Sequence, residues 1–377
     1  MASLSHSVEN VEPRSGATAN GMPLSLNRAP APDLDPWVGR VVVTRVHAAP
    51  DHEVHCSVFN DLAFSRVVLD GRWCAETPSG RVRVDRATVL MGPQSRRMDL
   101  SCRGGFATVN IGFRPGALDR LLDRPVSGLV DRVECADPFG LAGEGADAGF
   151  PDHASIEDCA LIAERRMRAF IERTQPREPD PVSSAFEAAS FLDPNTSPGD
   201  FAEAQDLSLR QVERIVRRDF GMTPRTVLRR ARAMDLACQM LGLSDAGEEQ
   251  DFLLRYFDQS HLIREFQHFF GVTPQAFRAR PRILLTLNLE ARAARRLEEL
   301  DRIAPGARRP WHESPEEEEE EEREAAAAGD DGKGEGDDRM DGVAEGGVER
   351  GGDDPSRHPA QGDAPSPPGK DDHSPRS

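Results

Sequence analysis

The spacing of hydrophobic residues changes character along the 377-residue chain. Between Trp37 and about Gly112, short runs rich in β-branched residues alternate apolar with polar positions: VGRVVVTRV, RVVLDGRW, GRVRVDRATVLM and GGFATVNIGF. Gly, Pro or Asp-Gly separates several of these runs. Alternation with a period of two, broken by turn residues, is typical of a small antiparallel sheet or barrel.

Helical spacing replaces this alternation further along the chain. The stretch SIEDCALIAERRMRAFIER at 155–173 predicts an amphipathic helix that opens on a Ser-x-x-Asp capping box. After a linker, TQPREPDP, the chain from about 183 to 282 is helical in pattern. Thirteen Arg and no Lys lie between Arg210 and Arg282. One further helix is predicted at 283–300.

Together the patterns predict an α+β fold, with a β-rich N-terminal domain followed by an all-α domain. Six segments follow: a disordered lead-in at 1–35, a β-rich domain at 36–150, a helix and linker at 151–182, a helical domain at 183–282, a C-terminal helix at 283–303, and a disordered acidic tail at 304–377. The first and last segments are predicted to be disordered because neither offers enough apolar residues for a core.

A short string of residues occurs twice in the helical domain, as FGMTPRTV at 220–227 and FGVTPQAF at 270–277. In each copy an Arg lies seven positions before the Gly, as Arg214 and Arg264. Glycine suits the left-handed position that ends a helix, while Thr-Pro suits the cap and first position of the next. The string is therefore predicted to end one helix and begin another.

Each copy follows the pattern of a helix-turn-helix unit. In the first, a short helix begins at Ser197-Pro198, and Asp206 takes the left-handed turn position, which Asp tolerates. Ser208 then caps the second helix and forms a capping box with Gln211. In the second, Asp258 is the expected cap. A single helix from 225 to 241 is predicted to join the two units.

The stretch from LSLRQVERIVRRDFGMTP to FQHFFGVTPQAFR resembles the DNA-binding domain of AraC/XylS-type transcriptional regulators over about 100 residues, 183–282. MGPQSR at 91–96 and IGFRPGALDRLLDRPVSGLVDRV at 111–133 resemble, more weakly, the N-terminal domain of one branch of that family. The resemblance implies that two recognition helices enter successive major grooves of promoter DNA, about 34 Å apart. It further implies an N-terminal domain that senses a small-molecule effector or mediates dimerisation. A homodimer and RNA polymerase are further partners that it leaves open.

Carried over residue by residue, the resemblance assigns base contacts to Arg210, Glu213, Arg214, Gln259, Ser260, Ile263 and Arg264. Arg can pair with guanine, Gln with adenine and Glu with cytosine, and Ile can meet a thymine methyl group. Phosphate contacts are expected at Ser208, Arg217, Arg218, Thr223, Gln267 and Thr273.

The second unit departs from the family pattern at two positions. Asp251 stands where the family has a small residue, and Arg255 stands where it has the turn Gly. The segment from Phe201 to Arg282 contains thirteen Arg and eleven Asp or Glu, so the helical domain is barely basic. The alternative hypothesis is therefore a degenerate member that binds other proteins and reads DNA weakly or without specificity.

Charge is concentrated near the C-terminus. The net charge is −18, and the segment from Glu313 to Asp354 contains nineteen acidic against four basic residues. We interpret the run Glu316–Glu322 as part of a solubilising spacer, with an interaction tail or a competitor of DNA as alternatives. If it competes with DNA, deletion of 311–377 is expected to tighten DNA binding at low salt.

Other candidate chemistry is weak. His47, His52, His55 and Cys56 lie close together but lack the spacing of a metal site, so polar loop and strand residues are the preferred interpretation. No nucleophile elbow, P-loop or dinucleotide fingerprint occurs. We expect no metal, no cofactor and no enzymatic activity, and a cupin-like enzyme is a distant third hypothesis.

The sequence contains six scattered cysteines and no CxxC pair. It shows no signal peptide and no apolar stretch of the roughly 18–20 residues that a membrane span needs. These features predict a cytoplasmic protein with reduced thiols and no membrane partner.

Overall fold

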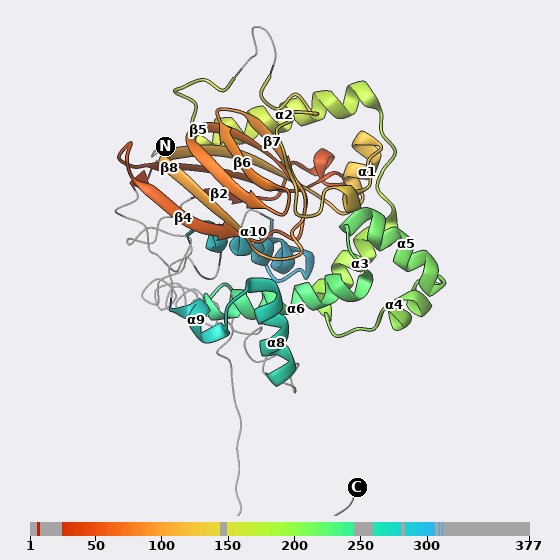
Figure 1. Cartoon of the computed structure of the whole chain (residues 1–377). Coiled ribbons are helices and arrows are strands. Elements are labelled where there is room, and N and C mark those ends of the chain that lie inside the picture. Colours follow the sequence, from red (N-terminus) through yellow and green to blue (C-terminus); the bar gives the residue numbers. More distant parts are fainter. Residues whose placement is uncertain are drawn as a thin grey trace, which may run out of the picture. The chain divides into compact units, whose positions relative to one another are not determined.

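The alternating runs of the N-terminal half form one nine-stranded sheet in the computed structural model (Figure 1). The structure describes residues 6–7, 25–143, 149–244, 259–279, 283–305, 309 and 311. The strands are β1 (His6–Ser7), β2 (Ser25–Arg28), β3 (Val38–His47), β4 (Glu53–Val58), β5 (Phe64–Thr77), β6 (Gly80–Asp85), β7 (Thr88–Met91), β8 (Met98–Phe113) and β9 (Val133–Glu134). The predicted acidic tail lies outside the described residues, apart from Arg309, Trp311 and the few residues up to 305.

The sheet is built around the long strand β8. It pairs antiparallel with β3, with β4 and with β5, and the order along the main path is β1-β3-β8-β5-β7-β9. β2 extends the sheet beside β3, and β6 pairs with β5 as the second arm of a hairpin. The predicted antiparallel β-rich domain is therefore confirmed.

The boundary predicted for the disordered lead-in is wrong. Ser25–Arg28 forms β2, whose residues pair with Val41–Thr44 of β3, and Pro32–Leu34 forms a 3₁₀ turn, η2, with Leu34 fully buried. Four residues with one apolar side chain cannot display an alternation. Their order comes from hydrogen bonds to β3, which lies more than a dozen residues further along the chain.

Helical segments make up the rest of the described chain. They are α1 (Ala117–Leu122), η3 (Val126–Gly128), α2 (Ile156–Thr174), α3 (Pro181–Leu192), α4 (Pro198–Ala204), α5 (Leu209–Phe220), α6 (Pro224–Met240), α8 (Gln259–Phe270), α9 (Pro274–Arg278) and α10 (Ile283–Glu299). The capping box predicted at the start of α2 is present, with the Ser155 hydroxyl accepting from the Asp158 backbone N–H.

Helices cover the sheet on both faces (Figure 1). On one face, α2 buries Ala160, Ala163 and Met167 against a core that includes Val41 and Ile111 of the sheet. On the other face, α10 contributes Leu284 and Leu287 to a core lined by strand residues, among them Phe64, Trp73, Leu100 and Phe106. The predicted C-terminal helix is thus a structural part of the β-rich domain.

The two helix-turn-helix units have separate cores. The first is built around Phe186, Phe201 and Phe220, whose rings meet edge to face. In the second, Phe266 and Phe270 stack with ring centroids 4.4 Å apart. This second core also contains Phe59, from the segment between β4 and β5, together with Leu285 and Leu289 of α10.

Candidate DNA-binding surface and enclosed cavity

The first helix-turn-helix unit consists of α4, the turn at residues 205–208, and α5. Asp206 has φ 53°, as predicted for the left-handed turn position. The Ser208 hydroxyl accepts from the Gln211 backbone N–H at the start of α5, and the Gln211 side chain accepts from Ser208 in return. At the end of α5, Gly221 has φ 78°, and the Thr223 hydroxyl then caps α6. Local capping signals alone define both ends of the recognition helix.

One face of α5 is apolar and buried and the other is polar and exposed. Val212 and Val216 are fully buried. The predicted base-reading residues Arg210, Glu213 and Arg214 are exposed, as is Arg217. None of these four side chains forms an ion pair with a described residue, so all are free to meet DNA.

Arg218 differs from its neighbours on α5. Its Nε lies 2.6 Å from Asp219 Oδ1 and 3.4 Å from Asp119 Oδ2, and its Nη2 lies 3.5 Å from Asp180 Oδ2. The hydrogen bond to Asp219, together with the three nearby carboxylates, raises the pKa of Arg218. The guanidinium is therefore already paired, and we leave Arg218 out of the proposed phosphate contacts.

The second unit presents its recognition helix α8 in the same way. Leu262 is buried, whereas Ile263 is 43% exposed, and Arg264 and Gln267 are exposed. No described carboxylate pairs with Arg264. Gln259 and Ser260 lie in the first turn of α8, and their side chains fall outside the described residues.

A helix stop and start closes the second unit as predicted. Gly271 has φ 69°, and the Thr273 hydroxyl accepts from the Ala276 backbone N–H to cap α9. The two departures of this unit from the family pattern, Asp251 and Arg255, lie outside the described residues, as does the predicted cap Asp258.

Both recognition helices end against the N-terminal domain. A Cβ placed on Gly221, after α5, would lie 2.5 Å from Val130 Cγ2. At the end of α8, the Arg97 backbone N–H donates to the Phe269 carbonyl at 2.9 Å. Val130 and Arg97 lie within or beside the stretches 111–133 and 91–96. In the sequence those stretches carry only a family resemblance, and in the structure they lie at the contact between domains.

Buried polar side chains reinforce this contact. Arg230 of α6 is 1% exposed and donates to the carbonyls of Gln94 and Asp61, both at 3.1 Å. The Asp61 carboxylate lies 2.7 Å from Arg295 Nη2 and 3.4 Å from Arg292 Nε. Burial acts to raise the pKa of Asp61, but the guanidinium groups outweigh it and hold that pKa below its usual value. Sequence reasoning missed these residues because their partners are distant in the chain.

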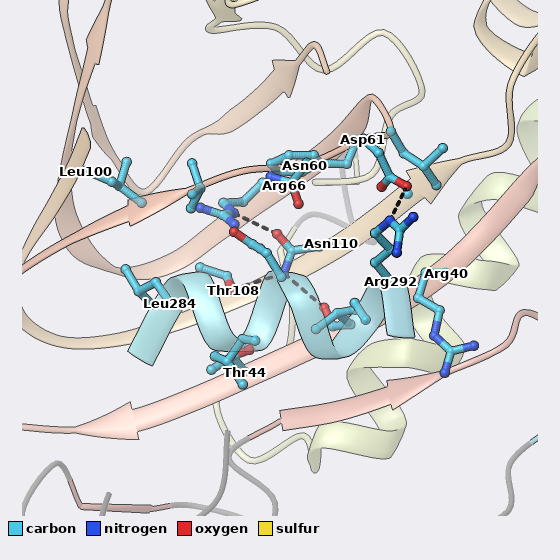
Figure 2. Close-up of a pocket in the computed structure, with 18 of the residues that line it drawn as sticks. Arg40, Thr44, Asn60, Asp61, Arg66, Leu100, Thr108, Asn110, Leu284 and Arg292 are labelled. Atoms are coloured by element: carbon cyan, nitrogen blue, oxygen red, sulfur yellow. Dashed lines mark hydrogen bonds and ion pairs between the residues drawn. The ribbon is translucent and has the colours of Figure 1, made fainter. Parts of the chain in front are cut away.

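A cavity of about 80 Å³ lies between the sheet and α10 (Figure 2). Strand residues Thr44, Arg66 and Asn110 line one side, and Leu284 and Arg292 of α10 line the other. Figure 2 shows these side chains directed toward the same space, with Arg66 bonded to Asn110 and Arg292 paired with Asp61. The cavity lies beside the described contact between domains.

Neither a candidate metal site nor a membrane-spanning helix occurs in the described ranges. No group of three or more His, Cys, Asp or Glu side chains with the geometry of a metal site occurs there. His47, His52 and His55 are exposed. None of the helices in those ranges is long and apolar enough to cross a bilayer.

Comparison with protein families decides the identity of the helical domain. Residues 201–280 match the family model described as a helix-turn-helix domain, which spans both units described above. The helical domain is a helix-turn-helix domain of the AraC type. Residues 27–134 match a domain of unknown function, DUF6597, whose start coincides with β2. Domains of this type bind DNA, so the match assigns the chain to transcription regulation.

Two solved structures similar to this chain are those of ToxT and CuxR, and both likenesses are distant. ToxT from Vibrio cholerae, in a crystal form solved at 1.65 Å, has a TM-score of 0.38 and 9% identity, covering 63% of this chain and 97% of ToxT. The AraC-like transcriptional activator CuxR has a TM-score of 0.22 and 12% identity, covering 68% of this chain and 91% of CuxR. At these TM-scores neither likeness supports an inference about function. No curated protein matches the chain.

Proposed function

We propose that this regulator reads promoter DNA with α5 and α8 in successive major grooves. One observation carries the proposal: Arg214 and Arg264, at the same position of the two repeats, are both exposed and both lack a described carboxylate partner. An exposed guanidinium on a recognition helix can donate two hydrogen bonds to guanine.

Neighbouring side chains extend the proposed reading surface. Glu213 can accept from a cytosine amino group, and Ile263 can contact a thymine methyl group. Arg217 has no described ion-pair partner and is suited to a phosphate. Gln259, Ser260 and Arg210 complete the proposed base contacts, and Ser208, Thr223, Gln267 and Thr273 complete the proposed phosphate contacts.

We further propose that residues 25–143, closed by α10, form a regulatory domain that binds an effector in the cavity. Support comes from two shared walls. Val58 and Asn60 line the cavity, while Phe59 between them packs in the core of the second unit. Likewise, α10 turns Leu287 toward the cavity and Leu289 into that second core. A ligand that shifts either wall would therefore disturb α8.

Selection of bound sequences from random double-stranded DNA tests the reading proposal. We expect the full chain to enrich a two-part motif with half-sites about one helical turn apart. Arg214→Ala should lose preference in one half-site and Arg264→Ala in the other, each costing about 1–3 kcal/mol of discrimination. Arg72→Ala, at an exposed position on β5, is the matched control and should enrich the wild-type motif.

Failure to enrich any motif would favour the alternative of a protein-interaction module. Loss of specificity in Arg214→Ala alone would mean that the second unit contributes little to reading. Homodimerisation and contact with RNA polymerase stay predictions from the sequence.

A further inference from the structure

Arg66 is a buried cation in the cavity for which the described chain offers no anionic partner. Its side chain is on β5, and the residue is 8% exposed. Its Nε donates to Asn110 Oδ1 at 2.6 Å, and its guanidinium carbon lies 5.1 Å from the ring centroid of Phe64 and 5.3 Å from that of Trp73. No described carboxylate lies within 4.0 Å of it, and its two terminal nitrogens donate to no described residue.

The other three arginines that line the cavity are all paired. Arg40 forms an ion pair with Glu298, Arg292 lies 2.5 Å from an Asp235 carboxylate oxygen, and Arg295 lies 2.7 Å from Asp61. The fold therefore supplies a carboxylate to each buried arginine here except Arg66.

An unpaired buried charge is costly, at several kcal/mol per ion even after relaxation. Burial lowers the pKa of Arg66 to about 10, which still leaves it charged at neutral pH. Its contacts with an amide oxygen and two aromatic faces offset only part of that cost. The position is therefore well suited to an anion that the described part of the chain does not provide.

Other polar atoms in the cavity also lack partners. Asn60 Nδ2 and Asn288 Oδ1 are buried and form no hydrogen bond with a described residue. One is a donor that can serve a carboxylate oxygen, and the other is an acceptor that can serve a hydroxyl group. The apolar part of the wall includes Trp73, Phe106 and Leu284.

We propose that the cavity binds a small organic acid, with its carboxylate on the terminal nitrogens of Arg66 and its apolar body against the aromatic wall. A carboxylate matches the planar fork of a guanidinium, and the apolar wall favours an acid with a hydrocarbon body over an inorganic ion. The cavity, at about 80 Å³, is several times the roughly 10–15 Å³ that holds one water molecule. This proposal rests on the effector-sensing role proposed above and names the ligand class.

Paired acids and amides test the proposal on the full-length protein without DNA. The probes are pentanoate and phenylacetate, each compared with its neutral amide. We expect both acids, and neither amide, to raise the thermal unfolding midpoint and to change the fluorescence of Trp73, which lies beside Arg66. The same titration on Trp73→Phe identifies the fluorescence signal.

Variants at position 66 locate the site. In Arg66→Met, acid affinity should fall roughly ten- to hundredfold because a charge-assisted pair is lost. Arg66→Lys should retain part of that affinity, and Arg72→Gln, at an exposed position on the same strand, should behave as wild type. A purely structural role for Arg66 predicts a different pair of results. Arg66→Met would have a lower unfolding midpoint, and Arg66→Lys would bind the acids with wild-type affinity.

The proposal is overturned if neither acid binds, if the amides bind as well as the acids, or if Arg66→Met retains wild-type acid affinity. The acid–amide comparison on the wild-type protein decides the matter even where a variant folds poorly. Since no DNA is present, a failure here leaves the selected DNA motif untouched, and a failure of DNA selection leaves the acid result untouched.

Discussion

At the scale of single residues, Arg217 and Arg218 show how far identical side chains can differ. They are neighbours on α5, yet Arg217 is exposed without a described partner while Arg218 is held by three carboxylates. One of these, Asp219, is 3% exposed and also accepts from the Ser183 hydroxyl. Arg218 therefore serves the fold, whereas Arg217 is available to DNA.

Alanine at each of these positions should separate the two roles. Arg217→Ala is expected to weaken binding to all DNA sequences alike and to reduce the slope of log affinity against log salt by about 1. Arg218→Ala should instead lower the free energy of unfolding by about 2 kcal/mol, because the buried Asp219 carboxylate loses its cation. Chemical denaturation and a salt titration of DNA affinity measure the two effects. Equal loss of stability in both variants would contradict this assignment.

At the scale of elements, the two Phe-Gly-x-Thr-Pro strings have the same backbone conformation and different neighbours. Gly221 and Gly271 have φ values of 78° and 69°. At Gly221 an added Cβ would lie 2.5 Å from Val130, while at Gly271 the nearest atom would be 3.5 Å away, on Arg97. The first string is therefore packed tightly against the N-terminal domain, and the second has room.

Gly221→Ala should cost more stability than Gly271→Ala. Each pays about 1 kcal/mol for a left-handed alanine, and Gly221→Ala adds the displacement of Val130. Denaturant midpoints of the two variants provide the comparison. Val130→Ala should recover part of the loss in Gly221→Ala and none in Gly271→Ala, and a rescue of both would refute the steric explanation.

At the scale of the whole molecule, α10 packs against both the β-rich domain and the second helix-turn-helix unit within the described chain. It begins a few residues after the second unit ends, yet Leu287 packs in the core beneath the sheet and Leu289 packs in the core that contains Phe266 and Phe270 of α8. Arg292 and Arg295 on the same helix pair with Asp61 of the β-rich domain. Under the proposed sensing role, a change at the cavity would reach α8 through this helix.

Truncation on the two sides of α10 should have different consequences. Leu287→Ala and Leu289→Ala are each expected to cost about 3 kcal/mol of stability, as large-to-small changes at buried positions. Hydrogen exchange of the α8 amides should accelerate strongly in Leu289→Ala, which loses a direct contact with that core, and more weakly in Leu287→Ala, whose effect reaches α8 through α10. Both variants are compared with wild type at matched distance from the unfolding midpoint. Wild-type exchange of α8 in Leu287→Ala would show that α10 does not transmit a change from the cavity to the second unit.

Local sequence determined the helix-turn-helix units, because their signals act over a few residues. Ser208 with Gln211, Asp206 in the turn and Gly221 before Thr223 all appear in the structure in the roles that their residue types predict. The alternation of the strands likewise predicted an antiparallel sheet.

Only the tertiary structure decided which arginines are free, that Ser25–Arg28 joins the sheet, and that α10 closes a cavity containing an unpaired Arg66. Pairing, burial and enclosure depend on contacts that local sequence does not specify, from the more than a dozen positions that separate paired residues of β2 and β3 to the more than two hundred that separate Arg40 and Glu298. The residues that flank a charged side chain in the sequence do not indicate whether an opposite charge will lie beside it in the folded protein.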